Sequence, residues 1–192
     1  MIEGFVGNVL SLLATASFMI VASLVLRQMN IFKTRSENKT GQRIIIAIVF
    51  GLLAIYGSLM GIETGGAILN VRELSPLMAG LVGGPIAGFL AGLIGGVHRY
   101  WLGGFTGLPC SISTIIAGVV SGIVATRITG KSFLLKGALL AFVFESGAMA
   151  LILLLSQPFS RAAQLVGQIA PPMITAVTLG FATFLYLLNS KR

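Results

Sequence analysis

Long apolar runs separated by short polar stretches are the dominant pattern along the chain. A helix of about 20 apolar residues crosses a lipid hydrocarbon core of about 30 Å. The apolar segments that approach this length are residues 5–26, 44–62, 74–97, 109–125, 133–155 and 165–188. The pattern therefore predicts an all-α integral membrane protein.

The composition supports lipid as the main solvent. Hydrophobic residues make up 56% of the 192 positions and charged residues only 9%, whereas a soluble domain carries about 25% charged residues. So few charges could not cover a soluble globule, which argues against a soluble enzyme, a disordered chain and a nucleic-acid-binding module. With one His and one Cys, Cys110, the chain offers no internal disulfide, no thiolate metal site and no catalytic Ser-His-Asp set. We expect no metal, no cofactor and no nucleic-acid partner.

Lysine and arginine residues gather beside the apolar segments at three places. These are Arg27, Lys33, Arg35, Lys39 and Arg43 after the first segment, Arg127, Lys131 and Lys136 around the start of the fifth, and Lys191-Arg192 at the end. Cytoplasmic loops carry an excess of Lys and Arg. We therefore expect these three places and the C-terminus to be cytoplasmic, and the N-terminus, with its acidic Glu3, to be outside.

Six straight crossings cannot satisfy this charge pattern. Between the end of the second segment and Arg127, the chain must pass from the outer to the cytoplasmic side, which takes one crossing of the membrane. This part of the chain nevertheless contains two apolar segments. Residues 74–97 are the candidate for a re-entrant hairpin, because Gly83-Gly84-Pro85 interrupts them and Pro85 lacks a helical donor. A Pro-kinked full span is the alternative, since glycine recurs at every fourth position from 80 to 96. The favoured fold is a bundle of five crossing helices plus one Gly/Pro-broken helical hairpin.

Polar side chains flank this glycine-rich segment. Arg72 precedes it and Arg99 follows it, so a hairpin returns both guanidinium groups to one face, whereas a straight span separates them. Pro109 suits the first turn of a helix, and Cys110 and Ser113 share one face of that turn. A helix N-terminus attracts anions, and Arg binds a carboxylate through two parallel hydrogen bonds. The sequence thus predicts a site for a small carboxylate.

Each of these residues also has a simpler interpretation. Arg72 and Arg99 could be interface anchors, Cys110 a small buried apolar residue, and Ser113 a donor to its own helix. Glu145 is the one acid deep in a predicted span, so it must face the bundle interior and be protonated or paired, with a pocket cation as the favoured partner.

Two further features have a predicted structural role. His98 is expected to be a packing or supporting residue, because the chain has no second His to share a metal. Pro171-Pro172, near the start of the last predicted span, should either kink that span or set its beginning.

Several spaced motifs resemble the LytS/YhcK-type five-transmembrane receptor domain. They are Asn70-Val71-Arg72, Gly83-Gly84-Pro85, Gly95-Gly96-Val97-His98-Arg99-Tyr100, Pro109-Cys110 and Ser113-Thr114. The resemblance extends over most of the chain, and several motifs in one order are more specific than a single glycine motif. In the pyruvate-sensing kinases of this family, the ligand residues fall on positions matched here by Arg72, Arg99, Cys110 and Ser113. Secondary candidates for the same site are Asn70, His98, Thr114 and Glu145.

The resemblance implies a sensory input domain in the bacterial inner membrane. Such a domain binds a 2-oxo acid such as pyruvate and controls a cytoplasmic output of a signal-transduction system, either a histidine kinase or a diguanylate cyclase. We expect residues 1–192 to form a single transmembrane sensor domain without catalytic activity, its output domain being absent from this chain. A homodimer within the lipid bilayer is expected, and small-residue helix faces would suit it.

A small-solute transporter, or the substrate-capture subunit of one, is the alternative function. Broken helices and glycine-rich packing also occur at transporter sites. Against it, the chain shows no pair of interrupted segments in corresponding positions of two halves, as an inverted repeat would.

Overall fold

Six long α-helices make up most of the part of the chain that the structure describes. The structure is a computed structural model, and it describes residues 2–28, 39–128, 130 and 132–189. The helices are α1 (Ile2–Gln28), α2 (Lys39–Leu59), α3 (Leu74–Trp101), α4 (Gly107–Val124), α5 (Phe133–Leu155) and α6 (Phe159–Asn189). By length and composition, all six could cross a membrane. The predicted all-α membrane fold is confirmed, and α5 has the bounds of the predicted segment 133–155.

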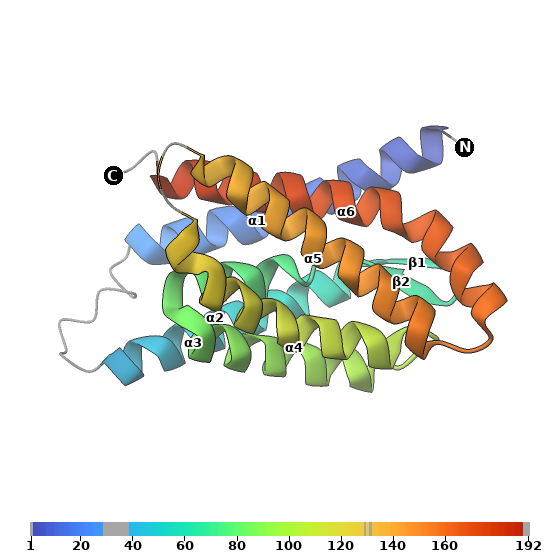
Figure 1. Ribbon diagram of the computed structural model, residues 1–192, viewed down its shortest axis with the longest axis horizontal. Coiled ribbons are helices and arrows are strands. Elements are labelled where there is room, and N and C mark those ends of the chain that lie inside the picture. Colours follow the sequence, from blue (N-terminus) through green and yellow to red (C-terminus); the bar gives the residue numbers. More distant parts are fainter. Residues whose placement is uncertain (1, 29–38, 129, 131, 190–192) are drawn as a thin grey trace.

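Helix α3 is broken in the middle, at the predicted position. Gly84 has φ 82° and ψ −178°, a conformation that only glycine adopts readily, and Pro85 follows it. On either side of this break, Gly80 and Gly88 both pack against the backbone of Gly118 in α4. In Figure 1 the green ribbon of α3 correspondingly runs to one end of the bundle, turns and comes back.

The two limbs of α3 run in opposite directions along α4. Arg72, just before the first limb, bonds to Thr114 of α4, and Leu77, within that limb, bonds to Ser121 of α4. Residue numbers therefore rise in the same direction along the first limb and along α4. In the second limb, Gly88 packs on Gly118 of α4, whereas Gly92 packs on Thr114 and Ile115. Residue numbers therefore rise along this limb in the direction in which they fall along α4. The hairpin is therefore confirmed and the straight span is excluded. The glycine ladder serves both limbs, because it lets each approach α4 closely.

The hairpin reaches almost the full depth of its neighbours. Its tip packs against Ile46, near the start of α2, and against Gly122, near the end of α4. Helix α3 lies between α2 and α4, while α6 packs against both α1 and α5 (Figure 1). Both ends of α3 consequently lie at one end of the bundle and its tip at the other.

A small β-hairpin joins α2 to α3 and was not anticipated. Strands β1 (Ile62–Thr64) and β2 (Ala67–Leu69) pair antiparallel. The turn between them is Gly65-Gly66, with φ 59° and 88°, the left-handed values that a two-residue hairpin turn requires. Strand β2 ends directly before Asn70, so this hairpin fixes the position of the short segment that contains Arg72.

The last helix begins earlier than predicted. Helix α6 starts at Phe159, so Pro171 and Pro172 lie inside it and do not set its beginning. In a membrane bundle, neighbouring helices and side-chain hydroxyls compensate for the backbone bonds that proline removes. The Thr175 hydroxyl donates to the Pro171 carbonyl, 2.8 Å away.

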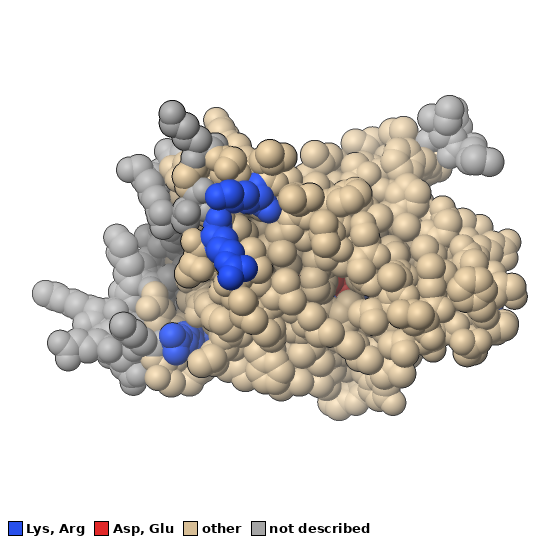
Figure 2. Space-filling view, in the orientation of Figure 1, with Lys and Arg blue, Asp and Glu red and all other residues tan. Residues whose placement is uncertain are grey.

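Exposed basic side chains gather at the hairpin-tip end, hereafter the basic end. Arg127, in the short 3-10 helix η1 (Ala125–Arg127), and Lys136 are exposed there, and Arg43 is partly exposed. Figure 2 shows the blue side chains together at this end of the molecule. Seven of the ten cations assigned to the cytoplasmic side lie outside the residues whose side chains are described; they are Arg27, Lys33, Arg35, Lys39, Lys131, Lys191 and Arg192.

Candidate functional site

Arg72 and Arg99 are fully buried at the end of the bundle opposite the basic end. Each has 0% of its surface exposed, which excludes the interpretation as interface anchors. Arg72 lies in the turn between β2 and α3. The Asn70 side chain shapes this turn: its amide donates to the Ile68 carbonyl at 2.9 Å, and its oxygen accepts from the Arg72 backbone N–H at 3.1 Å. Asn70 thus holds Arg72 in place through its own backbone.

The Arg72 guanidinium joins the start of α3 to the first turns of α4. Its Nε donates to the Thr114 hydroxyl at 2.6 Å, and its Nη2 donates to the Glu73 carboxylate at 2.8 Å and to the Cys110 carbonyl at 3.3 Å. The Glu73 oxygen also accepts from Ser113, at 2.9 Å. Burial of a charge is costly unless it is paired and hydrogen-bonded, and Arg72 meets both conditions.

Arg99 reaches the same place from the last turn of α3. Its guanidinium donates to the Gly103 carbonyl and to the Thr106 hydroxyl, the latter at 3.1 Å. Gly103 and Gly104 adopt φ 65° and 87°, so the loop turns back over the end of its own helix. Both of these acceptors are uncharged oxygens.

Cys110, in the first turn of α4, lies within electrostatic range of both arginines, which also interact with each other. The structure thus brings together the four predicted ligand residues, with Thr114 beside them. It adds two residues that the sequence reasoning missed, Glu73 and Thr106. We call this set the arginine cluster: Arg72, Glu73, Arg99, Thr106, Cys110, Ser113 and Thr114.

Several buried polar atoms of the cluster have no hydrogen-bond partner in the part of the chain that the structure describes. They include Nη1 of Arg72, Nε of Arg99 and Oε2 of Glu73. Buried polar groups in proteins are almost always hydrogen-bonded. The cluster therefore offers donors and an acceptor that a small polar ligand could satisfy.

Glu145 of α5 also faces the bundle interior, as expected. It is fully buried, and neither of its carboxylate oxygens has a hydrogen-bond partner among the described residues. It interacts electrostatically with Glu73 and Arg72, so the expected pocket cation is near but not bonded to it. His98 is only partly buried and interacts electrostatically with both arginines, consistent with a supporting position.

Comparison with known proteins gives several matches over most of the chain. A family model described as "5TMR of 5TMR-LYT" matches residues 9–191. The sensor histidine kinase BtsS of Escherichia coli (strain K12) is 40% identical in an alignment of 152 positions that covers 76% of this chain and 27% of that protein. The sensor protein LytS of Bacillus subtilis (strain 168) is 30% identical in an alignment of 200 positions that covers 93% of this chain and 34% of LytS. No solved structure gives a significant match.

The apolar helices, one of them broken, and the polar cluster buried among them define a multi-pass membrane domain with an internal polar site. The chain belongs to the 5TMR-LYT family, the membrane sensor domains of LytS- and BtsS-type sensor histidine kinases. It spans 27% to 34% of the length of these two relatives. The relatives are named as sensors, which supports the receptor interpretation over the transporter.

Proposed function

We propose that this domain senses a small carboxylate, of the 2-oxo acid class that includes pyruvate, by binding it in the arginine cluster. One observation carries the proposal. Arg72 has Glu73 as its ion-pair partner, whereas Arg99, although fully buried, forms no ion pair with a carboxylate in the part of the chain that the structure describes. Its hydrogen bonds to the Gly103 carbonyl and the Thr106 hydroxyl leave its charge unpaired. A buried cation without a carboxylate partner is expensive, and a ligand carboxylate would supply the missing negative charge.

The remaining groups of the cluster suit the rest of such a ligand. A carboxylate would accept from the unpartnered Nη1 of Arg72 and Nε of Arg99, and guanidinium forks favour planar anions. The Ser113 hydroxyl and the Cys110 thiol stand beside them on one face of α4 and could contact a neighbouring keto oxygen. The resemblance to pyruvate-sensing kinases, matched at Arg72, Arg99, Cys110 and Ser113, supports the same ligand class.

The loop between α3 and α4 offers a route from the ligand to the last helix. On one side this loop accepts from Arg99 through Gly103 and Thr106. On the other side, the Arg161 guanidinium of α6 lies 4.6 Å from the centre of the Phe105 ring. Ligand binding that shifts the loop would therefore change how α6 packs, and a ligand acts only through its different affinities for two states.

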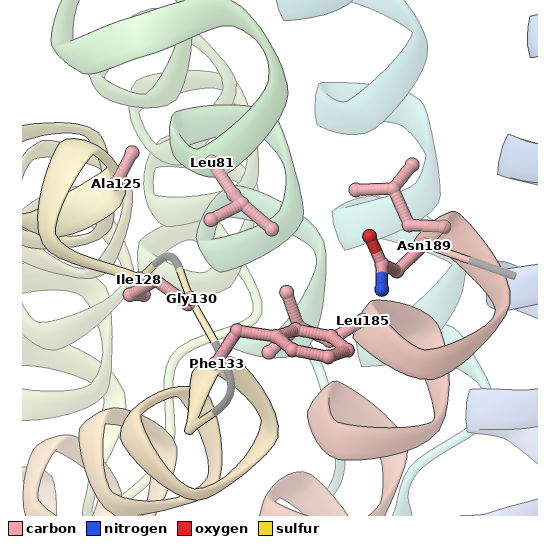
Figure 3. Close-up of a pocket in the computed structure, with 8 residues that line it drawn as sticks. Leu81, Ala125, Ile128, Gly130, Phe133, Leu185 and Asn189 are labelled. Atoms are coloured by element: carbon pink, nitrogen blue, oxygen red, sulfur yellow. The ribbon is translucent and has the colours of Figure 1, made fainter. Parts of the chain in front are cut away.

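A cavity of about 420 Å³ lies beside the far end of α6, at the basic end. Figure 3 shows Leu81 of α3, Phe133 of α5 and Leu185 of α6 converging on it. A displacement of α6 would therefore change the shape of this cavity and could pass to a following segment.

We further propose the orientation and assembly in the cell. The basic end faces the cytoplasm of a bacterial inner membrane, with the N-terminus outside and the C-terminus inside, because cytoplasmic ends carry the exposed Lys and Arg. The output is a histidine kinase, as in BtsS and LytS, and the domain works as a homodimer.

Calorimetry of pyruvate binding to the protein in lipid nanodiscs tests this function. Arg72→Ala and Arg99→Ala should each weaken binding at least about 30-fold, since loss of one member of a buried charge pair costs about 2–5 kcal/mol. Arg99→Lys keeps the positive charge but loses the two parallel hydrogen bonds of a guanidinium group. Its pyruvate affinity should lie between those of the unmodified protein and Arg99→Ala. Arg127→Ala, the same change at the basic end, should leave the affinity unchanged. Correctly folded Arg72→Ala and Arg99→Ala proteins that bind pyruvate normally would refute the proposal.

A further inference from the structure

A continuous apolar groove lies between α4 and α5. It consists of two adjoining hollows that share Leu140 and Val143 of α5. One hollow extends to Val124 and Leu139 at the basic end, and the other extends toward Ile116 and Leu151. Ile116, Leu139 and Val143 are among its exposed side chains, so the groove opens toward the surrounding lipid.

Two cations stand at one end of this groove, one on each wall. Arg127 follows the end of α4 and Lys136 lies in the first turn of α5; both line the groove and both are exposed. The rest of the groove wall is apolar. The groove thus has a positively charged head and an apolar body, the two properties of a binding site for an anionic amphiphile.

The length of the groove suits an acyl chain. From Lys136 to Leu151, α5 rises about 22 Å at about 1.5 Å per residue, whereas one leaflet contributes about half of a 30 Å hydrocarbon core. An acyl chain whose headgroup lies level with Lys136 would therefore fit within the groove. The space beside Gly147, in the far part of the groove, is open, since a Cβ at that position would meet no atom within 4 Å.

We propose that this groove is a binding site for an anionic phospholipid. Its phosphate contacts Arg127 and Lys136, and one acyl chain lies between α4 and α5 along Leu140 and Val143. The charge of the head selects anionic over zwitterionic lipid, because basic pockets between membrane helices bind anionic headgroups. The site is separate from the arginine cluster and does not depend on the proposed ligand.

Retention of lipid by the purified full chain tests this inference. Native mass spectrometry with phosphatidylglycerol or phosphatidylcholine added at equal concentration should show preferential retention of phosphatidylglycerol. The double variant Arg127→Ala/Lys136→Ala should lower its affinity by about 30-fold, the loss expected for two cations near a lipid surface. Arg43→Ala, a change at the same end but outside the groove, should retain the preference.

A second variant tests the contribution of the acyl chain to binding separately from that of the headgroup. Val143→Trp fills the middle of the groove and should reduce retention of both lipids without changing the folded fraction. Equal retention of the two lipids by the unmodified protein, or an unchanged preference in the double variant, would overturn the proposal. So would a Val143→Trp protein that loses a dimer but keeps its lipid, because the groove would then be a contact between two copies.

Discussion

The arginines at the two ends of the bundle differ in their surroundings and therefore in their roles. Arg72 and Arg99 are fully buried and hydrogen-bonded, whereas Arg127 is exposed at the basic end. A buried charge is tolerated only with compensating partners, while an exposed one costs little. Each of these arginines lies beside an apolar segment, so proximity to a span does not distinguish an interface anchor from a member of a binding site. The burial of the guanidinium group makes that distinction.

The acidic residues provide the sharpest way to break this comparison. Glu73→Gln should lower the free energy of unfolding by about 3–5 kcal/mol, because it leaves the buried Arg72 without its charge partner. Glu63→Gln, on the exposed face of β1, should change it by less than about 0.5 kcal/mol. Unfolding in mixed micelles with increasing dodecyl sulfate would measure both. Equal effects would mean that Arg72 does not depend on Glu73.

The glycines test whether close packing keeps the arginine cluster in the interior. A methyl group at Gly118 would collide with the backbone of Gly88, so Gly118→Ala should destabilise the protein by about 1–3 kcal/mol, as overpacking does. Gly167→Ala, on α6 with no atom near the added carbon, should be neutral or stabilise by up to about 1 kcal/mol. The same unfolding assay compares them. A neutral Gly118→Ala variant would contradict the close contact between the hairpin and α4.

Arg161 sharpens the comparison because it is exposed on α6 yet contacts Phe105, in the loop that accepts hydrogen bonds from the buried Arg99. Arg161→Ala removes the contact with Phe105 and should cost about 0.5–1 kcal/mol of stability. Pyruvate affinity should be unchanged, but the ligand-induced change in hydrogen exchange along α6 should be lost. A variant that transmits the change normally would exclude the α3–α4 loop as the route.

Much of the fold could be predicted because lipid imposes a strict requirement on helix length. The bounds of α5 and the broken centre of α3 follow from apolar runs, proline and the positions of the cations. The β-hairpin was missed because strands of three residues show no periodicity, although Gly65-Gly66 is a hairpin-turn signal. The first turns of α6 were missed because Arg161 and Gln164 lower the local hydropathy, while the helix itself continues to Phe159.

The main members of the site could be predicted, but not all of their partners. Arg72 and Arg99 flank the hairpin, so closing it brings them together. Glu73 and Thr106 were missed because hydropathy does not reveal which groups a buried guanidinium contacts across the chain. Asn70 was expected at the site, yet its hydrogen bonds close its own turn. The ligand-binding role of all these residues stays a prediction.

Cysteine labelling tests most directly the claim that α3 returns to the face it leaves. In a Cys110→Ser background, Glu63→Cys and Leu102→Cys provide exposed positions before and after α3, and Arg127→Cys marks the basic end. Membrane-impermeant maleimide should modify positions 63 and 102 from the same side of sealed vesicles, and position 127 only from the other. Labelling of positions 63 and 102 from opposite sides would contradict the hairpin and with it the shared arginine site.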